Sequence, residues 1–316
     1  MATKEKLNFK QSLDFTETFN MAVKFIRQNF FHLFKCILLV AGPFVLMSAI
    51  ANGFYQKSVF SSAYLRSGDI SSLFFQIGIV LVTAILASLA LIGTTYEYII
   101  IYTEKGPGNF DVNDVGRALM RDIGNILWTF TGIFLLMLLI GVVIGMMFFA
   151  FSKISTVLFV LLMILLVIGL FIIMPPMMFV FSSVYLIRLK ERFTLSGALS
   201  HAFYVMKGNF WWTWLIMFCV YLCVAIIQTI FVIPQSIMSV MMAFSSIRGD
   251  GNEGTSLALM IVSSAGTFFS TLMYFIFLVF ATVHYFSLLE KKEGKGLMER
   301  IGEIGTRKDN SVEGTY

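Results

Sequence analysis

The chain has 316 residues, of which 58% are hydrophobic and 13% are charged, and its formal net charge is +5. Soluble domains carry roughly a quarter charged residues, which solvate their surface. A chain this apolar, with a mean hydropathy of +0.85, cannot solvate itself. The composition excludes an ordinary soluble domain and predicts a protein whose solvent is lipid.

Six apolar runs contain no Asp, Glu, Lys or Arg except at their boundaries. Each is long enough for one spanning helix of about 20 residues. The expected spans lie near 34–54, 72–96, 128–151, 155–185, 211–233 and 257–287. The sequence therefore predicts an all-α, polytopic membrane protein with six transmembrane helices. Residues 1–305 are expected to form a single integral membrane domain, followed by a disordered cytoplasmic tail over 306–316.

The N-terminal region is predicted to contain a surface helix. Residues 1–13 are polar and expected to be mobile. A helix over 14–31, with Asp14 or Thr16 as N-cap, is expected to lie in the membrane interface. Its apolar residues recur at helical spacing and comprise Phe19, Ala22, Val23, Ile26 and Phe30. Gly42-Pro43 is expected to interrupt the first span, because proline has no backbone N–H.

Two further amphipathic helices are predicted, one after the cap Asp111 and one from Thr194. Pro175-Pro176 is expected to break the fourth span. Pro234 is expected to end the fifth helix, with an interfacial segment over 236–246. Four tryptophans near the starts of the third and fifth spans are expected to be interfacial anchors: Trp128, Trp211, Trp212 and Trp214.

Positive charge is distributed unevenly between the two sides of the membrane. Of the 23 lysines and arginines, all but Lys57, Arg66, Lys153 and Arg248 lie in the termini and in the second and fourth loops. Positive loops stay cytoplasmic, so we expect a bacterial inner-membrane protein with both termini in the cytoplasm. The cytoplasmic basic cluster Arg188, Lys190 and Arg192 then signals topology and attraction to anionic lipid, and no nucleic-acid partner is expected.

The chain contains an internal similarity with three members. Tyr98, Tyr185 and Tyr285 each open a segment that ends an even-numbered span with an acidic and a basic residue. The repeat units are near 14–105, 110–192 and 194–292, each with one amphipathic helix and two spans. Units with an even number of spans insert with the same polarity, so these repeats would be parallel. Chance similarity between apolar helices is the alternative.

Two titratable residues in the predicted spans are candidates for a substrate or proton site. Glu97 lies inside an apolar segment, and His284 occupies the equivalent position in the third unit. Ionisable residues inside a membrane are functional candidates by default. The competing interpretation places Glu97 near the cytoplasmic surface, where it reaches headgroups or basic side chains.

Motifs for catalysis and metal binding are missing from the sequence. Three histidines and three cysteines occur without HExxH, His-x3-His or Cys/His clustering, and there is no Walker A motif or Gly-x-Ser-x-Gly elbow. We therefore expect a non-enzymatic protein with no metal and no cofactor.

Small and polar residues in the spans are expected to mediate helix contacts. Gly141 and Gly145 form a GxxxG motif, and Ser263, Thr267 and Thr271 form an i, i+4 stripe. Both are expected to pack within the molecule. Gln228 is expected to find its partner on a neighbouring helix.

Some segments resemble known proteins. Residues 285–305, the motif Phe25-Ile-Arg-Gln-Asn-Phe30 and the motif Ala41-Gly-Pro-Phe44 resemble a group of uncharacterised six-span envelope proteins from Bacteroidetes. The architecture is similar to the membrane domain fused to some glycerophosphodiester phosphodiesterases. The resemblance implies six spans and carries no activity, and the catalytic domain of those phosphodiesterases is missing from this chain.

The leading functional expectation is a non-enzymatic inner-membrane protein that acts in membrane organisation, lipid handling or support of a partner complex. Its partners would be membrane lipids and other membrane proteins. The alternative is a transporter of small solutes or lipids, with a cavity between the repeat units and Glu97 and His284 near its mouth. An intramembrane enzyme is the third reading. A polar cavity at mid-membrane would favour transport, and a packed centre would favour the scaffold.

Overall fold

Helices make up nearly all of the chain that the computed structural model describes, which is residues 6–9, 11–59, 70–154, 156–248 and 253–294. No strand occurs among these residues, so the predicted all-α class is confirmed. The predicted tail over 306–316 lies outside them. The helices are α1 (Phe15–Cys36), the π-helix η1 (Ile37–Ala41), α2 (Gly42–Val59), α4 (Ile70–Lys105), α5 (Val112–Ile154), α6 (Thr156–Lys190), α7 (Leu195–Met206), α8 (Phe210–Arg248), α9 (Glu253–Leu272) and α10 (Phe275–Glu293).

Six helical stretches of the described chain are long and apolar enough to cross a membrane: Phe15–Val59, Ser71–Lys105, Val112–Phe151, Thr156–Lys190, Phe210–Ser245 and Gly254–Glu293. The predicted six-span, multi-pass architecture is therefore confirmed. Each stretch has at least 35 residues, whereas crossing the hydrocarbon takes about 20. Every stretch therefore extends beyond the apolar layer.

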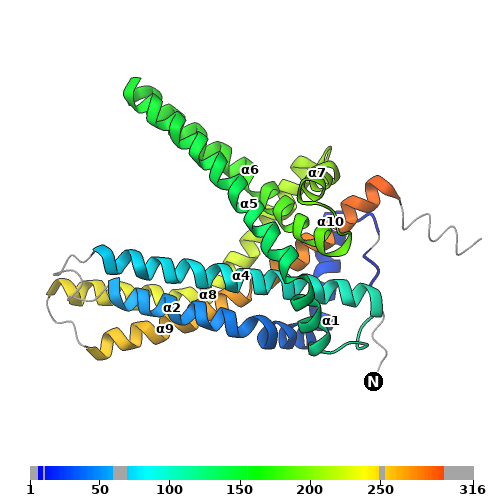
Figure 1. Ribbon diagram of the computed structural model, residues 1–316, viewed down its shortest axis with the longest axis horizontal. Coiled ribbons are helices and arrows are strands. Elements are labelled where there is room, and N and C mark those ends of the chain that lie inside the picture. The colour runs from blue at the N-terminus through cyan, green and yellow to red at the C-terminus, as the bar shows by residue number, and fades with distance from the viewer. Residues whose placement is uncertain (1–5, 10, 60–69, 155, 249–252, 295–316) are drawn as a thin grey trace, which may run out of the picture.

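The helices converge on a base and leave it as two arms (Figure 1). The bundle arm consists of α2, the N-terminal half of α4, most of α8 and α9, with α2 contacting α4 and α9, and α8 contacting α9. The hairpin arm consists of the C-terminal part of α5 and the N-terminal part of α6, and it diverges from the bundle (Figure 1). The base contains α1, α7, α10 and the remaining parts of α4, α5 and α6.

The hairpin arm has no protein cover along its most apolar stretches. None of the residues in those stretches of α5 and α6 is buried inside the protein. Exposed apolar area of this extent is unfavourable in water, so hydrocarbon is the expected surrounding of this arm.

Helix α10 forms the centre of the base. Every residue from Phe275 to Leu288 except Ile276 is buried, and α10 contacts α1, α4, α6, α7 and α8. A helix that is apolar on all sides has no preferred solvent face and is stable only when it is surrounded. The centre of the base is therefore packed with side chains.

The C-terminal ends of α4, α6 and α10 lie together in the base, and three amphipathic segments lie around them. The C-terminal parts of α4 and α6 contact each other and α10. Outside them, α1 contacts α10 and α4, α5 contacts α4 and α6, and α7 contacts α6 and α10. Each amphipathic segment thus lies in the groove between two neighbouring helix ends.

The first amphipathic helix and the first span form one continuous helical rod, which corrects the predicted interruption at Gly42-Pro43. Pro43 cannot donate to the carbonyl oxygen of Leu39. The backbone changes to π-helical spacing over Ile37–Ala41, and the N–H of Gly42 donates to the carbonyl oxygen of Ile37. This local widening lets the helix continue past the proline.

The buried face of α1 differs from the predicted stripe. Its buried residues are Thr18, Ala22, Phe25, Asn29, Leu33 and Cys36, whereas Val23 and Phe30 are exposed. The face that became buried is the one that α10 and α4 cover. Both faces of this helix contain apolar residues, so the packing partner decided between them.

Pro175 and Pro176 do not break the fourth span, because α6 remains helical through both. Pro175 lacks the N–H that would bond the carbonyl oxygen of Phe171. The indole Nε1–H of Trp214, on α8, donates to that oxygen at 3.3 Å. A side chain from a neighbouring helix thus replaces the missing backbone donor.

The fifth helix continues past its predicted end, and the sixth span consists of two helices. Pro234 does not end the fifth helix, since α8 continues to Arg248 and includes the predicted interfacial segment over 236–246. The sixth span is divided at Met273-Tyr274 into α9 and α10. Gln228 of α8 donates from Nε2 to the carbonyl oxygen of Ser270 at 3.0 Å, close to this division, so the predicted partner on a neighbouring helix is confirmed.

The described part of the segment before α1, residues 6–9 and 11–14, is packed against the base, which corrects the mobility predicted for it. The other residues of the predicted mobile segment 1–13 lie outside the described chain. Leu7, Phe9 and Leu13 are buried. The ring of Phe9 lies 6.0 Å from that of Phe286, 6.1 Å from that of Tyr102 and 5.3 Å from that of Phe25. The N–H of Leu13 donates to Ser287 Oγ at 2.9 Å.

The contact between α2 and α9 depends on small residues. A Cβ atom on Gly53 would lie 2.1 Å from Ser264 Oγ and 2.6 Å from the carbonyl oxygen of Met260. Asn52 Nδ2 donates to Thr267 Oγ1 at 2.7 Å, so the predicted polar stripe of α9 does mediate a helix contact. The GxxxG motif does not, because a Cβ atom on Gly141 or Gly145 would meet no atom within 4 Å.

Candidate functional site

A charged groove lies at the base between the end of α4, the start of α5 and the end of α6. Its volume is about 410 Å³. Basic and acidic side chains both line it, together with a few apolar ones: Glu97, Ile100, Ile101, Glu104, Lys105, Asp114, Arg117, Ala118, Arg121, Leu189, Lys190 and Arg192. We call this the charged groove.

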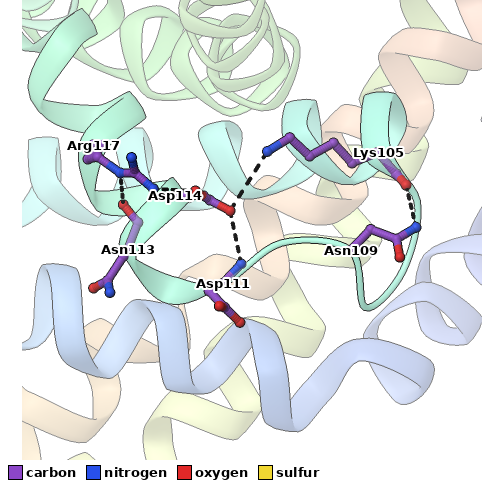
Figure 2. Close-up of polar contacts among 6 residues, drawn as sticks. All are labelled: Lys105, Asn109, Asp111, Asn113, Asp114 and Arg117. Atoms are coloured by element: carbon purple, nitrogen blue, oxygen red, sulfur yellow. Dashed lines mark hydrogen bonds and ion pairs between the residues drawn. The ribbon is translucent and has the colours of Figure 1, made fainter.

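A short turn brings α4 and α5 together on one side of the groove. Gly106 and Gly108 have φ values of 81° and 79°, a left-handed conformation that glycine adopts without strain. The side chain of Asn109 closes the turn by donating to the carbonyl oxygen of Lys105 at 2.8 Å. The N–H of Asp111 donates to Asp114 Oδ2 at 3.2 Å, which fixes the first turn of α5 (Figure 2).

An exposed chain of ion pairs follows this turn (Figure 2). Asp114 lies 3.7 Å from Lys105 Nζ and 2.7 Å from Arg117 Nη2. Both basic side chains are more than half exposed. Exposed ion pairs of this kind contribute about 0–1 kcal/mol each, so Lys105 and Arg117 can exchange these partners for a ligand at little cost.

Asp122 anchors the other side of the groove. Its side chain is only 1% exposed, and its carboxylate lies 3.0 Å from Arg121 Nη2 and 3.0 Å from Arg192 Nη1. Asn125 Nδ2 also donates to it at 3.3 Å. Arg192 follows α6 with a φ of 57°, so the bridge to Asp122 joins the end of α6 to α5.

Asp122 was missed by the sequence analysis, although a signal for it exists. The buried residues of this part of α5 are Val115, Ala118, Leu119, Asp122, Ile126 and Thr129, and they follow helical spacing. The neighbouring apolar residue Ile123 is exposed. An acidic residue inside an apolar stripe indicates a buried ion pair, and its arginine partner lies 70 residues away.

Glu97 lies at the floor of the charged groove. It is 2% exposed, and its Oε1 atom has no hydrogen-bond partner among the described residues. The charged groups that act on it electrostatically are Asp122, Arg121, Arg192 and Glu104. The structure thus places the predicted site residue Glu97 in the base, within electrostatic reach of Arg121 and Arg192.

His284 lies in different surroundings. It is buried in α10, where its Nε2 atom is 3.1 Å from Thr213 Oγ1 and its ring packs against that of Phe179 at 5.1 Å. It does not line the charged groove. The structure therefore does not bring the two predicted titratable residues into one site.

Only part of the basic cluster predicted from sequence stays together, because Lys190 and Arg192 line the charged groove and Arg188 does not. Arg188 is buried in α6. Lys190 lies over the ring of Phe286 at 4.3 Å and also lines the charged groove. Arg192 pairs with Asp122. Alternate residues of a helix point in different directions, so closeness in sequence did not mean closeness in space.

The four tryptophans also have different roles. Trp128 and Trp211 are mostly exposed, which suits interfacial anchors. Trp212 packs against Phe15 at 6.0 Å. Trp214 stacks on Phe218 at 4.9 Å and bonds the carbonyl of Phe171, so it joins α8 to α6.

The chemistry available at the charged groove is the binding of charged groups. Guanidinium and ammonium donors suit phosphate oxygens, and carboxylates suit ammonium groups. Among the described residues no group of three His, Cys, Asp or Glu side chains could hold a metal ion. Comparison with family models, curated proteins and solved structures found no match for this chain.

Proposed function

We propose that this is a non-enzymatic integral protein of the bacterial inner membrane, with both termini in the cytoplasm, which handles lipids at its cytoplasmic face. The observation that carries the proposal is the charged groove. It lies at the end of the protein where the predicted cytoplasmic loops meet and holds basic residues from α4, α5 and α6. Headgroups lie at this level of a membrane.

The position of the groove relative to the arms supports lipid as its occupant. The two arms extend from the base (Figure 1) and are expected to lie in the hydrocarbon layer. The groove is lined by residues from the parts of α4, α5 and α6 that belong to the base. A lipid with its acyl chains against the exposed arm surfaces would place its phosphate near Lys105, Arg117 and Arg121. Apolar and charged contacts would then act on the same molecule.

The base also supports the three parallel repeats as the origin of this architecture. The ends of α4, α6 and α10 surround one another, and each amphipathic segment lies between two of them. Two of the units also have an irregular feature at the same distance from their tyrosine. Helix α10 begins at Phe275, ten residues before Tyr285, and Pro175 lies ten residues before Tyr185. Parallel repeats are related by an axis along the membrane normal, which fits this cyclic arrangement. The same six-span plan is implied by the resemblance to the phosphodiesterase-associated membrane domains.

The alternative function is a transporter with a cavity between the repeat units. It is favoured by the buried titratable residues Glu97 and His284, which lie in two different units. Against it stand the separate surroundings of these residues and the packing of α10, whose residues are buried along the length of the base. A path through the centre would require this helix to move, so the scaffold with a lipid site is the better supported function.

Lipid retention tests the proposal directly. The protein would be purified in mild detergent, and bound phospholipid would be quantified by mass spectrometry. Arg117→Gln and Arg121→Gln are expected to reduce retained phospholipid several-fold, whereas Lys57→Gln, at the far end of α2, should not. Equal lipid content in all four proteins would refute a lipid site at the groove.

A further inference from the structure

The buried carboxylate in the charged groove distinguishes it from a simple phosphate site. Two other acidic residues of this region have basic partners, since Asp114 pairs with Arg117 and Lys105, and Asp122 pairs with Arg121 and Arg192. Glu97 is more than nine-tenths buried, and its Oε1 atom has no hydrogen-bond donor among the described residues. A buried charged oxygen without a donor is unfavourable, so this position calls for a donor from a ligand.

The donor must enter from the groove, because Glu97 belongs to its lining. The apolar side chains of Ile100, Ile101 and Leu189 line the same space and are themselves buried. They lower the local polarity, which strengthens any charge interaction made there. A positively charged group with N–H donors satisfies the Glu97 carboxylate best.

The basic residues at the rim of the groove require a negatively charged group on the ligand. Arg117, Arg121 and Lys105 are more than half exposed at its rim, and guanidinium groups bind phosphate oxygens in bidentate geometry. The occupant therefore carries a phosphate and an ammonium group in one small molecule. Resting on the lipid-handling function proposed above, we propose that the charged groove selects phospholipids with a primary-amine headgroup, of the phosphoethanolamine type.

Other headgroups fit the groove less well. A choline headgroup carries a positive charge but has no N–H to donate to Glu97. A glycerol headgroup donates from hydroxyl groups but brings no positive charge to the carboxylate. The phosphate is common to all three, so the arginines supply affinity and Glu97 supplies selectivity between headgroups.

The experiment measures headgroup preference for the purified full-length protein. Nanodiscs would contain choline lipid with equal small amounts of isotope-labelled ethanolamine and glycerol lipids. Lipids carried out of the disc with the protein would be quantified by native mass spectrometry. The wild type should enrich the ethanolamine lipid over both others, by about tenfold, as one charge-assisted hydrogen bond allows.

Two carboxylate variants separate the role of Glu97 from a general charge effect. Glu97→Gln keeps the size of the side chain and removes its charge, and it should abolish the preference while total phospholipid binding remains. Glu191→Gln makes the same change at the exposed end of α6, outside the groove, and should keep the preference. If Glu97→Gln fails to fold, the headgroup panel on the wild type still decides the question.

The outcomes distinguish the two proposals. Binding of all three lipids in equal amounts by the wild type would overturn the headgroup selectivity and leave the lipid site in place. If the wild type carried no lipid out of the disc, and Arg121→Gln gave the same result, the lipid-handling function itself would be overturned. Full displacement of the labelled lipid by soluble phosphoethanolamine at no more than the concentration of the lipid would show that the acyl chains add no affinity, and this would overturn a lipid as the occupant of the groove.

Discussion

The hydrogen bond from Trp214 to the carbonyl oxygen of Phe171 exists because Pro175 cannot supply its own N–H. Replacing Trp214 by Phe removes the donor and leaves this carbonyl unpaired between two helices. Interhelical hydrogen bonds in membranes contribute about 0.6–2 kcal/mol, and an N···O distance of 3.3 Å favours the lower part of that range. A phenyl ring keeps much of the packing on Phe218, so we expect a loss of about 1 kcal/mol.

A double-mutant cycle with Pro175→Ala isolates the hydrogen bond from the packing. Alanine at position 175 has the backbone N–H that can bond the carbonyl oxygen of Phe171 within α6. In this background Trp214→Phe should cost only its packing contribution, so a coupling energy near 1 kcal/mol is expected. Reversible unfolding in mixed micelles, followed by circular dichroism, provides the four free energies.

Trp128→Phe is the matched control, because Trp128 is mostly exposed and lies on a different helix, α5. It should leave the stability unchanged in both backgrounds. If Trp214→Phe cost the same free energy with proline and with alanine at position 175, the two changes would be additive. The carbonyl freed by proline would then have no role in holding α6 to α8.

Three further predictions concern other contacts. Gly53→Ala should destabilise the bundle arm by about 1–3 kcal/mol, since its Cβ would overlap Ser264 and Met260. Gly141→Ala, in open surroundings, should be neutral. Equal melting temperatures for the two variants would contradict the close contact between α2 and α9. Phe9→Ala should release the segment before α1 and make it sensitive to limited proteolysis, with the helices intact; unchanged protection would count against its anchoring role. Asp122→Asn should lower the free energy of unfolding by about 1–2 kcal/mol, and high salt should reduce this loss; a neutral substitution would show that the arginines do not need this carboxylate.

The candidate site was only partly predictable. Glu97 was identified because an acidic residue in an apolar run stands out in any sequence. Its surroundings were not, because Asp122, Arg121 and Arg192 come from α5 and the end of α6, and nothing local indicates that they meet. The basic cluster Arg188, Lys190 and Arg192 was identified as a group, yet each of the three side chains contacts different neighbours.

The sequence by itself determined the features that depend on local composition. Long apolar runs specify six helices, and Thr194 caps α7 as predicted by accepting from the N–H of Gly197 at 3.3 Å. The N-terminal cap of α1 at Asp14 is also formed by residues close in sequence, since the N–H of Asp14 donates to Glu17 Oε2 at 2.9 Å. Charge asymmetry and the three tyrosine-led helix ends are visible in the chain without any knowledge of its packing.

Only the tertiary structure decided how the prolines, helix faces and arms behave. Pro175 and Pro234 lie within continuous helices, and Trp214 supplies the donor that Pro175 lacks. Helices that are apolar all round have no intrinsic inward face. The hairpin arm is more apolar than the stretch that contains α10, yet α10 is buried and the hairpin arm is not. The difference arises from which neighbours each helix meets, and that information is spread over distant parts of the chain.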